Sequence, residues 1–365
     1  MKIQVQKEGI SKALQTVQNA INPRATLPIL SNILIQTEEK KIKLTGTDLD
    51  IGISIIIDAD VQTPGAITVP AKRFSDIIRE FSEGLIVITA KKNNIVTIES
   101  ENTLFKIIGL PQEEFPKLPE FQENQFITLP QSMLKKMLNM TSFSMSRDET
   151  RYILNGTLFA IREDSISLVA TDGRRLSLIK KPFETPKGLT ARFIVPIKTV
   201  NELIRTLKDA QEDMKMLYTQ NQILFNLGET TIISRLIEGE YPNYEQVIPK
   251  EADDKLIIDR EKLLLATKRA SLMTTQDSLA VRLDVYKEKV VVSKSTPDIG
   301  ESKEELKAQY TGGQLSIGFN PNYIIDVLKN IDTKTIAVEL MGTDKPGVIR
   351  LGDEYTYVVL PMQLS

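Results

Sequence analysis

The chain has 365 residues, 41% of them hydrophobic, and a formal net charge of −2, so it is long enough for about two or three packed domains. It contains neither Cys nor His, which excludes disulfides, thiolate metal sites and Ser-His-Asp catalysis. No apolar run approaches the roughly 20 residues of a membrane helix, and the first residues lack the apolar region of a signal peptide. Since no glycine-rich phosphate loop occurs either, we expect a cytoplasmic protein without a cofactor or a metal.

In chain order, six segments carry apolar residues at the i, i+3, i+4, i+7 spacing of a helix with one buried face. They cover roughly residues 7–20, 71–82, 130–141, 197–210, 260–272 and 320–331. The second, fourth and sixth follow a β-like run and have a Pro at or near the first turn, where its missing N–H costs least. Alternating stretches such as 95–100 and 336–340 predict strands between the helices.

This pattern of helices and strands occurs three times. Phe74, Val200 and Ile324 begin the same apolar helix face about 125 residues apart, and Asp48 and Asp172 follow equivalent strands. The period is the size of an ordinary domain and too long for a solenoid repeat. We therefore predict three α+β domains, at residues 1–123, 124–249 and 250–365.

Charge is distributed unevenly along the chain. Five of the six helical segments carry a net positive charge, and the rest of the chain is correspondingly acidic. Solvated helix faces often collect Lys and Arg, which is the simpler explanation. The recurrence of the bias in equivalent helices favours an anionic partner such as a nucleic-acid backbone.

Two clusters of carboxylates suggest other chemistry. Asp48 and Asp50, with Asp58 and Asp60 nearby, could hold a divalent cation, and with Asp172 they could serve a metal-dependent hydrolase or lyase. The alternative is a turn at the end of a strand, in which Thr and Asp bond the local backbone. We favour the turn because the same Thr-Asp pair recurs at 171–172. The hydrolase stays as an alternative function, and a scaffold without a role on DNA is a second one.

Two further segments have the character of a binding surface. The turn Thr171-Asp172-Gly173-Arg174-Arg175-Leu176 presents two Arg side chains beside an apolar residue, which suits an acidic or amphipathic peptide. The segment from Tyr357 to Ser365 is largely apolar, as in a strand that also borders an apolar pocket, with Met362 as an adaptable contact.

Taken together, several strings resemble the β subunit of bacterial DNA polymerase III, the family of DNA sliding clamps. They span the chain in the order and spacing of that family, and only the whole set is specific. The strings are Arg24-Ala25-Thr26-Leu27-Pro28-Ile29-Leu30, Leu44-Thr45-Gly46-Thr47-Asp48-Leu49, Val69-Pro70-Ala71, Arg151-Tyr152-Ile153-Leu154-Asn155-Gly156, Ala170-Thr171-Asp172-Gly173-Arg174-Arg175-Leu176, Tyr241-Pro242-Asn243-Tyr244 and Val358-Val359-Leu360-Pro361-Met362.

The resemblance implies a fold and a function. Three clamp domains per chain, with helices lining the inside and antiparallel sheets outside, would form a head-to-tail homodimeric ring. Such a ring encircles duplex DNA without sequence specificity and makes the replicative polymerase processive, with no catalytic activity of its own. The clamp loader and repair polymerases would bind it through short peptide motifs, and no membrane is involved.

The resemblance also implies three sets of site residues. Those that would face DNA are Lys12, Arg24, Lys72, Arg147, Tyr152, Lys198 and Arg205. Those that would form the pocket for partner peptides are Leu154, Thr171, Gly173, Arg174, Arg175, Leu176, Pro242, Val247, Val358, Val359, Pro361 and Met362. Those that would form the dimer interface are Arg73, Phe105, Ile107, Leu272, Met273, Glu301 and Glu304.

Overall fold

The computed structural model describes residues 1–22, 27–119, 121, 126–185 and 189–364. By their contacts they form two compact units, the first made of Met1–Lys135 with Asn201–Leu236 and the second of Lys136–Val200 with Ile237–Ser365. The domain boundaries that the repeat predicts, at 123/124 and 249/250, stay a prediction.

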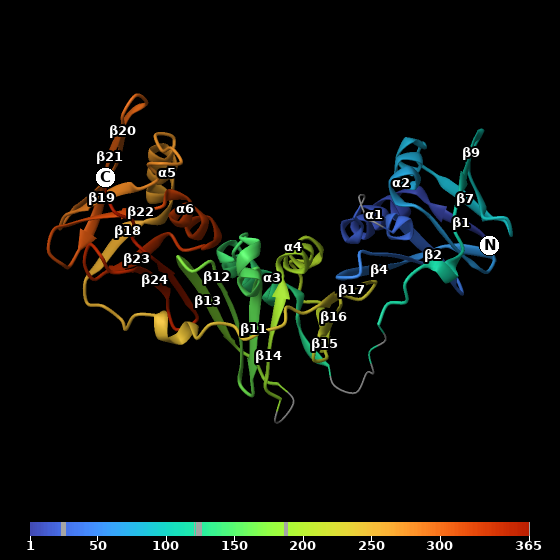
Figure 1. The fold of residues 1–365 in the computed structure, drawn as a ribbon, viewed down its shortest axis with the longest axis horizontal. Helices are drawn as coiled ribbons and strands as arrows, with labels where there is room; N and C mark the ends of the chain where they lie inside the picture. Colours follow the sequence, from blue (N-terminus) through green and yellow to red (C-terminus); the bar gives the residue numbers. More distant parts are fainter. Residues whose placement is uncertain (23–26, 120, 122–125, 186–188, 365) are drawn as a thin grey trace. The chain divides into compact units, whose positions relative to one another are not determined.

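Six α-helices occur in the described residues, in the places that the apolar spacing predicts (Figure 1). Their bounds are α1 (Lys7–Val17), α2 (Ala71–Glu80), α3 (Gln131–Thr141), α4 (Ile197–Thr206), α5 (Arg260–Ser271) and α6 (Pro321–Asn330). The predicted apolar faces are the buried ones, as with Ile10 and Leu14 of α1 and Phe74 and Ile78 of α2. Within the units α1 packs against α2, and α5 packs against α6.

Local capping sets where two of these helices begin. The Asp259 side chain accepts a hydrogen bond from the backbone N–H of Lys262 and caps α5, and Asn320 caps α6 in the same way through Asn322. Pro321 takes the first position of α6, where its fixed φ suits the helix. None of the helices in the described ranges has the length and hydrophobicity of a transmembrane span.

The first unit contains two antiparallel sheets. The smaller has the order β5-β1-β7-β8-β9, with β1 (Lys2–Gln6), β5 (Asp60–Thr63), β7 (Leu85–Ala90), β8 (Ile95–Ser100) and β9 (Thr103–Ile108). The larger has the order β10-β15-β16-β17-β4-β3-β2-β6. Its strands are β2 (Asn32–Glu38), β3 (Lys41–Thr47), β4 (Ile51–Asp58), β6 (Ala66–Pro70), β10 (Ile127–Pro130), β15 (Asp213–Tyr218), β16 (Gln222–Asn226) and β17 (Thr230–Arg235).

The second unit contains one antiparallel sheet with the strand order β14-β11-β12-β13-β25-β24-β23-β18-β21-β20-β19-β22. Its strands are β11 (Gly156–Arg162), β12 (Ser165–Thr171), β13 (Arg175–Pro182), β14 (Ala191–Pro196), β18 (Lys255–Asp259), β19 (Val281–Val285), β20 (Lys289–Thr296), β21 (Gly300–Tyr310), β22 (Leu315–Phe319), β23 (Thr335–Leu340), β24 (Gly347–Leu351) and β25 (Tyr355–Val359).

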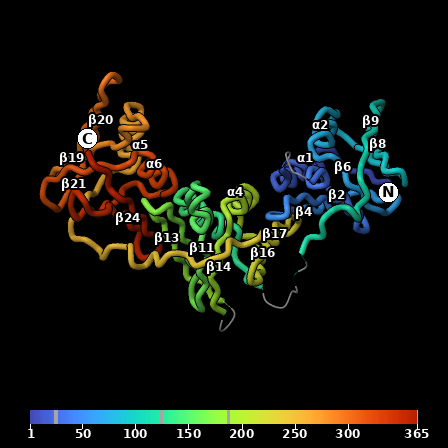
Figure 2. Tube along the Cα trace, viewed as in Figure 1, coloured from blue at the N-terminus to red at the C-terminus, as the bar shows by residue number. Residues whose placement is uncertain are grey.

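Strand pairing in both units joins segments from successive repeats. Ile53 of β4 pairs with Ile232 of β17 in the first unit, and Leu176 of β13 pairs with Val358 of β25 in the second. Backbone hydrogen bonds therefore run without a break from one repeat into the next. Figure 2 shows the long connecting segments that follow β9 and β17 along the chain.

Candidate functional site

The turn at 171–176 is held by its own side chains. Asp172 Oδ1 accepts hydrogen bonds from the backbone N–H groups of Arg174 (2.9 Å) and Arg175 (3.0 Å). The Thr171 hydroxyl donates to the carbonyl of Arg175 at 2.6 Å and accepts from the N–H of Gly173 at 3.0 Å. Gly173 has a φ of +85°, which favours glycine. The side chains that the sequence offers as catalytic or metal-binding groups are thus used to close a turn.

The equivalent turn at 47–51 has the same bonds. Asp48 Oδ1 accepts from the N–H groups of Asp50 (3.1 Å) and Ile51 (2.9 Å), and the Thr47 hydroxyl donates to the carbonyl of Ile51 (2.9 Å). Among the described residues, no group of three or more acidic side chains is placed to hold a metal ion. The interpretation of Thr-Asp as a strand-end turn is therefore confirmed.

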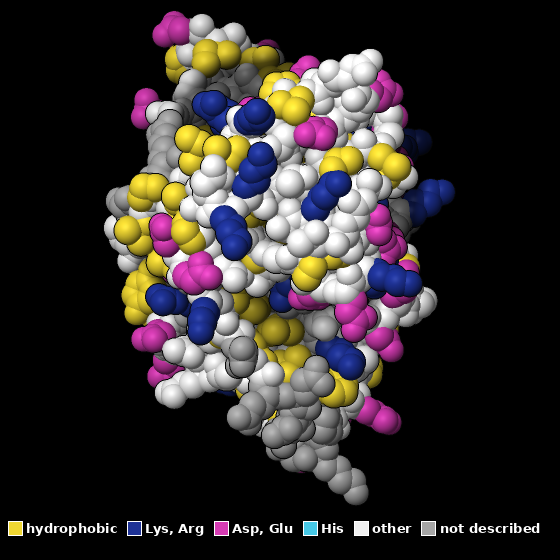
Figure 3. All heavy atoms as spheres, turned by 90° about the vertical axis from the view of Figure 1, so that its right-hand side faces the viewer, with side chains coloured by type: hydrophobic (Ala, Val, Ile, Leu, Met, Phe, Trp, Pro, Cys, Tyr) yellow, Lys and Arg dark blue, Asp and Glu magenta, His cyan; other side chains and the backbone are white. Residues whose placement is uncertain are grey.

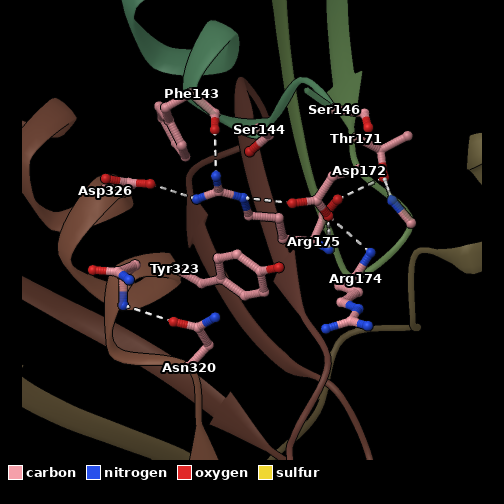
Figure 4. A network of polar contacts seen from close by, with 12 residues as sticks. Phe143, Ser144, Ser146, Thr171, Asp172, Arg174, Arg175, Asn320, Tyr323 and Asp326 are labelled. Carbon is pink, nitrogen blue, oxygen red and sulfur yellow. Dashed lines mark hydrogen bonds and ion pairs between the residues drawn. The ribbon is translucent and has the colours of Figure 1, made fainter. Parts of the chain in front are cut away.

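Arg175 does not project into solvent as the sequence suggested. Its side chain is 9% exposed, and its guanidinium donates to Asp172 (3.1 Å), to Asp326 (2.7 Å) and to the Phe143 carbonyl (2.5 Å), as Figure 4 shows. The guanidinium also lies 4.4 Å from the centre of the Tyr323 ring. Arg175 is therefore a buried connector between β13, α6 and the segment after α3.

Charge pairing keeps this guanidinium ionised despite its burial. Burial by itself disfavours the charged form, but Tyr357, Asp326 and Asp172 together raise the pKa of Arg175. Burial likewise raises the pKa of Tyr357, whose hydroxyl donates to the Tyr323 carbonyl at 2.8 Å. Arg174, one residue earlier, is exposed. Only one of the two neighbouring Arg side chains is thus available to a ligand.

Beside this network the second unit has a cavity of about 210 Å³. Its lining residues come from the turn, β13, β25, the segment after α3 and the connecting segment around Pro242. They are Leu154, Thr171, Gly173, Arg174, Arg175, Leu176, Pro242, Asn243, Tyr244, Val247, Val358 and Leu360. Its floor belongs to a buried apolar cluster that includes Leu158, Val169, Leu176, Tyr244 and Val348. Aliphatic walls with one exposed guanidinium suit an extended peptide with apolar anchors.

Nine of the twelve residues predicted for this pocket line the cavity. Val359, Pro361 and Met362 do not. Val359 is 2% exposed and points to the opposite face of β25, since side chains alternate along a strand. The Met362 N–H donates to the Gly318 carbonyl at 2.8 Å, which ties this part of the chain to β22.

Three lining residues were missed by the sequence-based prediction. Leu360 shares the face of Val358 by the same alternation, so period-2 counting from Val358 could have found it. Asn243 and Tyr244 follow Pro242 in the connecting segment. No strand or α-helical periodicity marks them, because Asn243 precedes and Tyr244 begins a single short 3-10 helix, Tyr244–Val247.

The residues predicted to face DNA are exposed wherever they are described. Lys12 of α1, Lys72 of α2 and Arg205 of α4 belong to the first unit. Lys198 of α4, Arg147 and Tyr152 belong to the second unit, and Tyr152 is 57% exposed. Arg24 lies outside the described residues. Most of these cations project from helices, as an electrostatic contact surface requires.

Of the residues predicted for the dimer interface, those on strands lie on β9 and β21, and the others lie on α2 or just after α5. β9 is the last strand of its sheet, and its side chains Leu104 (53%), Phe105 (37%) and Ile108 (77%) are exposed. Ile107 is buried inside its own unit, 7% exposed. Figure 3 shows the side of the first unit that carries β9, where hydrophobic side chains lie among Lys and Arg. The exposed Arg73 lies on α2.

The predicted complement belongs to the second unit. Leu272, which follows α5, is 73% exposed, and Met273 is half-buried. Glu301 is exposed on β21, and Glu304 on the same strand forms an ion pair with Arg269 at 2.6 Å. In the described residues, Gly300–Lys307 of β21 pairs only with β20, so the opposite edge of this stretch is open.

Comparison with known proteins finds the same family in all three parts of the chain. Family models of the N-terminal, central and C-terminal domains of the DNA polymerase III beta subunit match residues 1–119, 128–243 and 245–363. The chain belongs to the DNA polymerase III beta subunit family. Its structure has three clamp domains of helices and antiparallel sheets, as the resemblance implied.

Individual relatives agree with this assignment. The beta sliding clamp of Chlamydia pneumoniae is 31% identical over 364 residues, which are 100% of this chain and 99% of that protein. The beta sliding clamp of Escherichia coli K12 is 34% identical, with both chains fully covered. The crystal structure of the DNA polymerase sliding clamp from Bacillus subtilis superposes with a TM-score of 0.96 at 30% identity, over 100% of both chains.

Proposed function

We propose that two copies of this chain form a closed ring around duplex DNA and tether the replicative DNA polymerase to it. The observation that carries the proposal is the match of all three domains, in order, to a family of sliding clamps. Like the family, the protein acts by holding another enzyme near its substrate and has no catalytic step of its own. A polymerase that releases DNA then rebinds quickly, because its effective concentration stays high.

The contact with DNA is electrostatic and carries no base readout. The exposed Lys and Arg on α1, α2 and α4 meet phosphate oxygens, which are the same at every base pair. Since the chain as a whole has a net charge of −2, this attraction is modest. Persistence on DNA comes from closure of the ring, and weak contacts allow the ring to slide. The protein works in the bacterial cytoplasm, where its DNA and polymerase are.

The dimer forms head to tail between the open edge of β9 in one copy and the open edge of β21 in the other. An edge strand exposes unpaired backbone groups, and pairing with a second strand satisfies them. Exposed Leu104, Phe105 and Ile108 would pack against Leu272 and Met273. Arg73 would face Glu301. Two identical contacts of this kind close a ring of two copies.

Partners bind the cavity beside Arg174 through short extended peptides. Apolar peptide side chains enter between Leu176, Val358 and Val247, and Arg174 fixes their register. This mode serves the polymerase, the clamp loader and repair polymerases alike, so partners compete for one site. Leu360 and Tyr244 join the predicted residues as contacts.

The ring is tested by a covalent lock. The chain has no Cys, so Phe105→Cys with Leu272→Cys places thiols only at the proposed interface. Chains dissociated by dilution are concentrated with a nicked circular plasmid and treated with a bismaleimide, then denatured in dodecyl sulfate. We expect protein that stays with the circular DNA after denaturation and is released when one restriction cut makes the DNA linear.

Each single-cysteine variant is the matched control, because it places only one thiol at each contact and so cannot lock either contact. Locked dimers that never remain on the circle would contradict a ring. Locked dimers that survive the restriction cut would indicate ordinary adhesion to DNA. The hydrolase alternative predicts a tight magnesium or manganese site in a calorimetric titration, and the scaffold alternative predicts no difference between circular and linear DNA.

A further inference from the structure

The first unit has a cavity that no part of the clamp function above uses. It measures about 620 Å³ and lies where the segment after β9 crosses the eight-stranded sheet. In Figure 2 this segment runs from β9 along the side of β2 and β4. The lining residues are Leu34, Gln36, Lys43, Thr45, Ser54, Gln112, Glu113, Phe115, Pro116, Lys117, Leu118, Pro119, Leu224, Thr231 and Ile233.

This cavity occupies the same place in the repeat as the cavity of the second unit. In both, a connecting segment with an aromatic residue before Pro crosses strands of two successive repeats. The equivalent positions are about 125 residues apart, as the repeat requires. The pairs are Leu34 with Leu158, Thr45 with Val169, Gly52 with Leu176, Phe115 with Tyr241, Pro116 with Pro242, Leu118 with Tyr244, Leu224 with Val348 and Ile233 with Val358.

Two equivalent positions carry smaller side chains in the first unit than in the second. Gly52 stands where the second unit has Leu176, and Leu118 stands where it has Tyr244. Leu118 lies directly over Gly52, since a Cβ added there would meet Leu118 Cδ2 at 2.7 Å. The connecting segment therefore contacts the sheet through Leu118 packed on Gly52, and the cavity lies beside this contact.

The floor of the first cavity is polar where the second is apolar. Thr45, Ser54 and Thr231 are neighbours across three strands, and the Thr45 and Ser54 hydroxyls are 3.1 Å apart. The half-buried Lys43 lines the same cavity. Lys41, on the same strand, pairs with Asp58 at 4.0 Å, whereas no ion pair of Lys43 is found in the described ranges. A half-buried Lys side chain without an ion-pair partner in the described residues suits an anionic ligand.

We propose that this cavity binds a short extended peptide with an acidic side chain, whose carboxylate pairs with Lys43 while its aliphatic side chains pack against Leu34, Leu224 and Ile233. The volume suits a ligand of this size. Lys43 and Lys117 outnumber Glu113 at the cavity, so the site is cationic. The choice of a peptide rests on the peptide binding proposed for the equivalent cavity of the second unit.

The test uses the full-length protein with methyl-labelled Leu, Val, Ile and Thr. The probe is the acetylated, amidated hexapeptide Ala-Leu-Glu-Leu-Glu-Ala, and its Gln-for-Glu analogue is the matched neutral probe. Methyl signals of Leu34, Thr231 and Ile233 report on the first cavity, and those of Leu176, Val247 and Val358 report on the second. We expect the acidic peptide to shift the first set, with at least a fivefold weaker Kd for the neutral analogue.

Variants identify the group that binds the carboxylate. Lys43→Met should raise the Kd of the acidic peptide at the first cavity at least fivefold. The methyl spectrum of the free variant should keep the signal dispersion of a folded protein. Lys41→Met, on the same strand but outside the cavity, is the matched control and should leave the Kd unchanged. An unchanged Kd for Lys43→Met overturns the proposal.

The two sets of methyl signals test the two binding proposals separately. Shifts confined to the second set overturn the present inference and leave the clamp pocket intact. Shifts confined to the first set support this inference and contradict the peptide pocket of the second unit, and no shifts in either set contradict both. Equal shifts with free glutamate at the same concentration would show a site for small carboxylates and overturn the assignment to a peptide.

Discussion

Among single residues, Arg175 connects three parts of the second unit. It joins the carboxylates of Asp172 and Asp326, the Phe143 carbonyl and the Tyr323 ring while staying 9% exposed. The adjacent Arg174 is exposed: its backbone N–H donates to Asp172, its carbonyl accepts from the Leu360 N–H, and its side chain reaches the Tyr323 hydroxyl. One residue therefore holds the turn in place, and its neighbour is exposed beside the proposed peptide pocket.

The two arginines predict opposite effects. Arg175→Met should lower the free energy of unfolding by about 3 kcal/mol, since it leaves a half-buried Asp326 and a nearly buried Asp172 without their cation. Arg174→Met is the matched control and should change stability by less than about 0.5 kcal/mol. Thermal unfolding followed by circular dichroism measures both. Equal midpoints for the two variants would show that the network does not stabilise the fold.

Lys294 is a buried cation of a different kind. It is 6% exposed, and its ammonium donates to the Ser278 hydroxyl at 2.6 Å. Burial lowers the pKa of Lys294. Below its folded pKa the charged form destabilises the fold. The penalty is lost as the pH rises from that pKa toward the ordinary lysine value, because there the unfolded chain binds more protons than the folded one.

Lys294→Met should therefore raise stability at neutral pH by about 1 kcal/mol, since methionine fills a similar volume without a charge. The gain should shrink as the pH rises toward the ordinary lysine range, because the lysine of the parent protein loses its proton there earlier than in the unfolded chain. Chemical denaturation at pH 7 and pH 10 measures it. Lys303→Met, an exposed position on β21, is the control. A variant less stable than the parent at pH 7 would show that the ammonium is needed.

Among the elements, the edge strands carry the proposed dimer contact. β9 ends its sheet with three exposed apolar side chains, a pattern that an isolated chain would avoid because it invites pairing with another strand. β21 is longer than its neighbour β18 and is left unpaired along one edge of Gly300–Lys307. Two such edges in one molecule suit head-to-tail association.

The interface gives a quantitative prediction. Phe105→Ala with Leu272→Ala should raise the dissociation constant of the dimer by at least about 100-fold, since each truncation removes roughly 1.5–3 kcal/mol of apolar burial. Sedimentation equilibrium measures this constant. Leu265→Ala is the matched control, because Leu265 is 40% exposed on α5, the helix that ends just before Leu272. An unchanged constant for the double variant would move the interface elsewhere.

Element boundaries were predicted better than element partners. The i, i+3, i+4, i+7 spacing located all six helices within a few residues, because burial of one face produces the spacing directly. The pairing of β4 with β17 and of β13 with β25 was not predicted. Strand partners distant in the chain are chosen by packing of whole sheets, which leaves no local pattern in the sequence.

At the scale of the whole molecule, we expect retention of a closed ring on circular DNA to be independent of the electrostatic attraction between protein and DNA. A ring locked on circular DNA stays bound at 1 M salt, where the Debye length of about 3 Å removes most attraction between exposed charges. Replacing Lys12, Lys72, Lys198 and Arg205 by Gln should lower the yield of rings assembled around DNA at low salt and leave this retention unchanged. Gel electrophoresis of locked complexes measures both. Loss of locked rings from circles at high salt would contradict topological binding.

The sequence by itself determined the helices, the threefold repeat, the Thr-Asp turns and the family, because each leaves a local or a periodic pattern. It also located most of one pocket, since nine residues named from the resemblance line a single cavity. Only the tertiary structure decided that Arg175 is buried, that Val359 points away from the cavity and Leu360 into it, and that a second cavity lies beside Gly52 and Leu118. Those features depend on which face of a strand meets which distant segment, and that is settled only when the sheets pack.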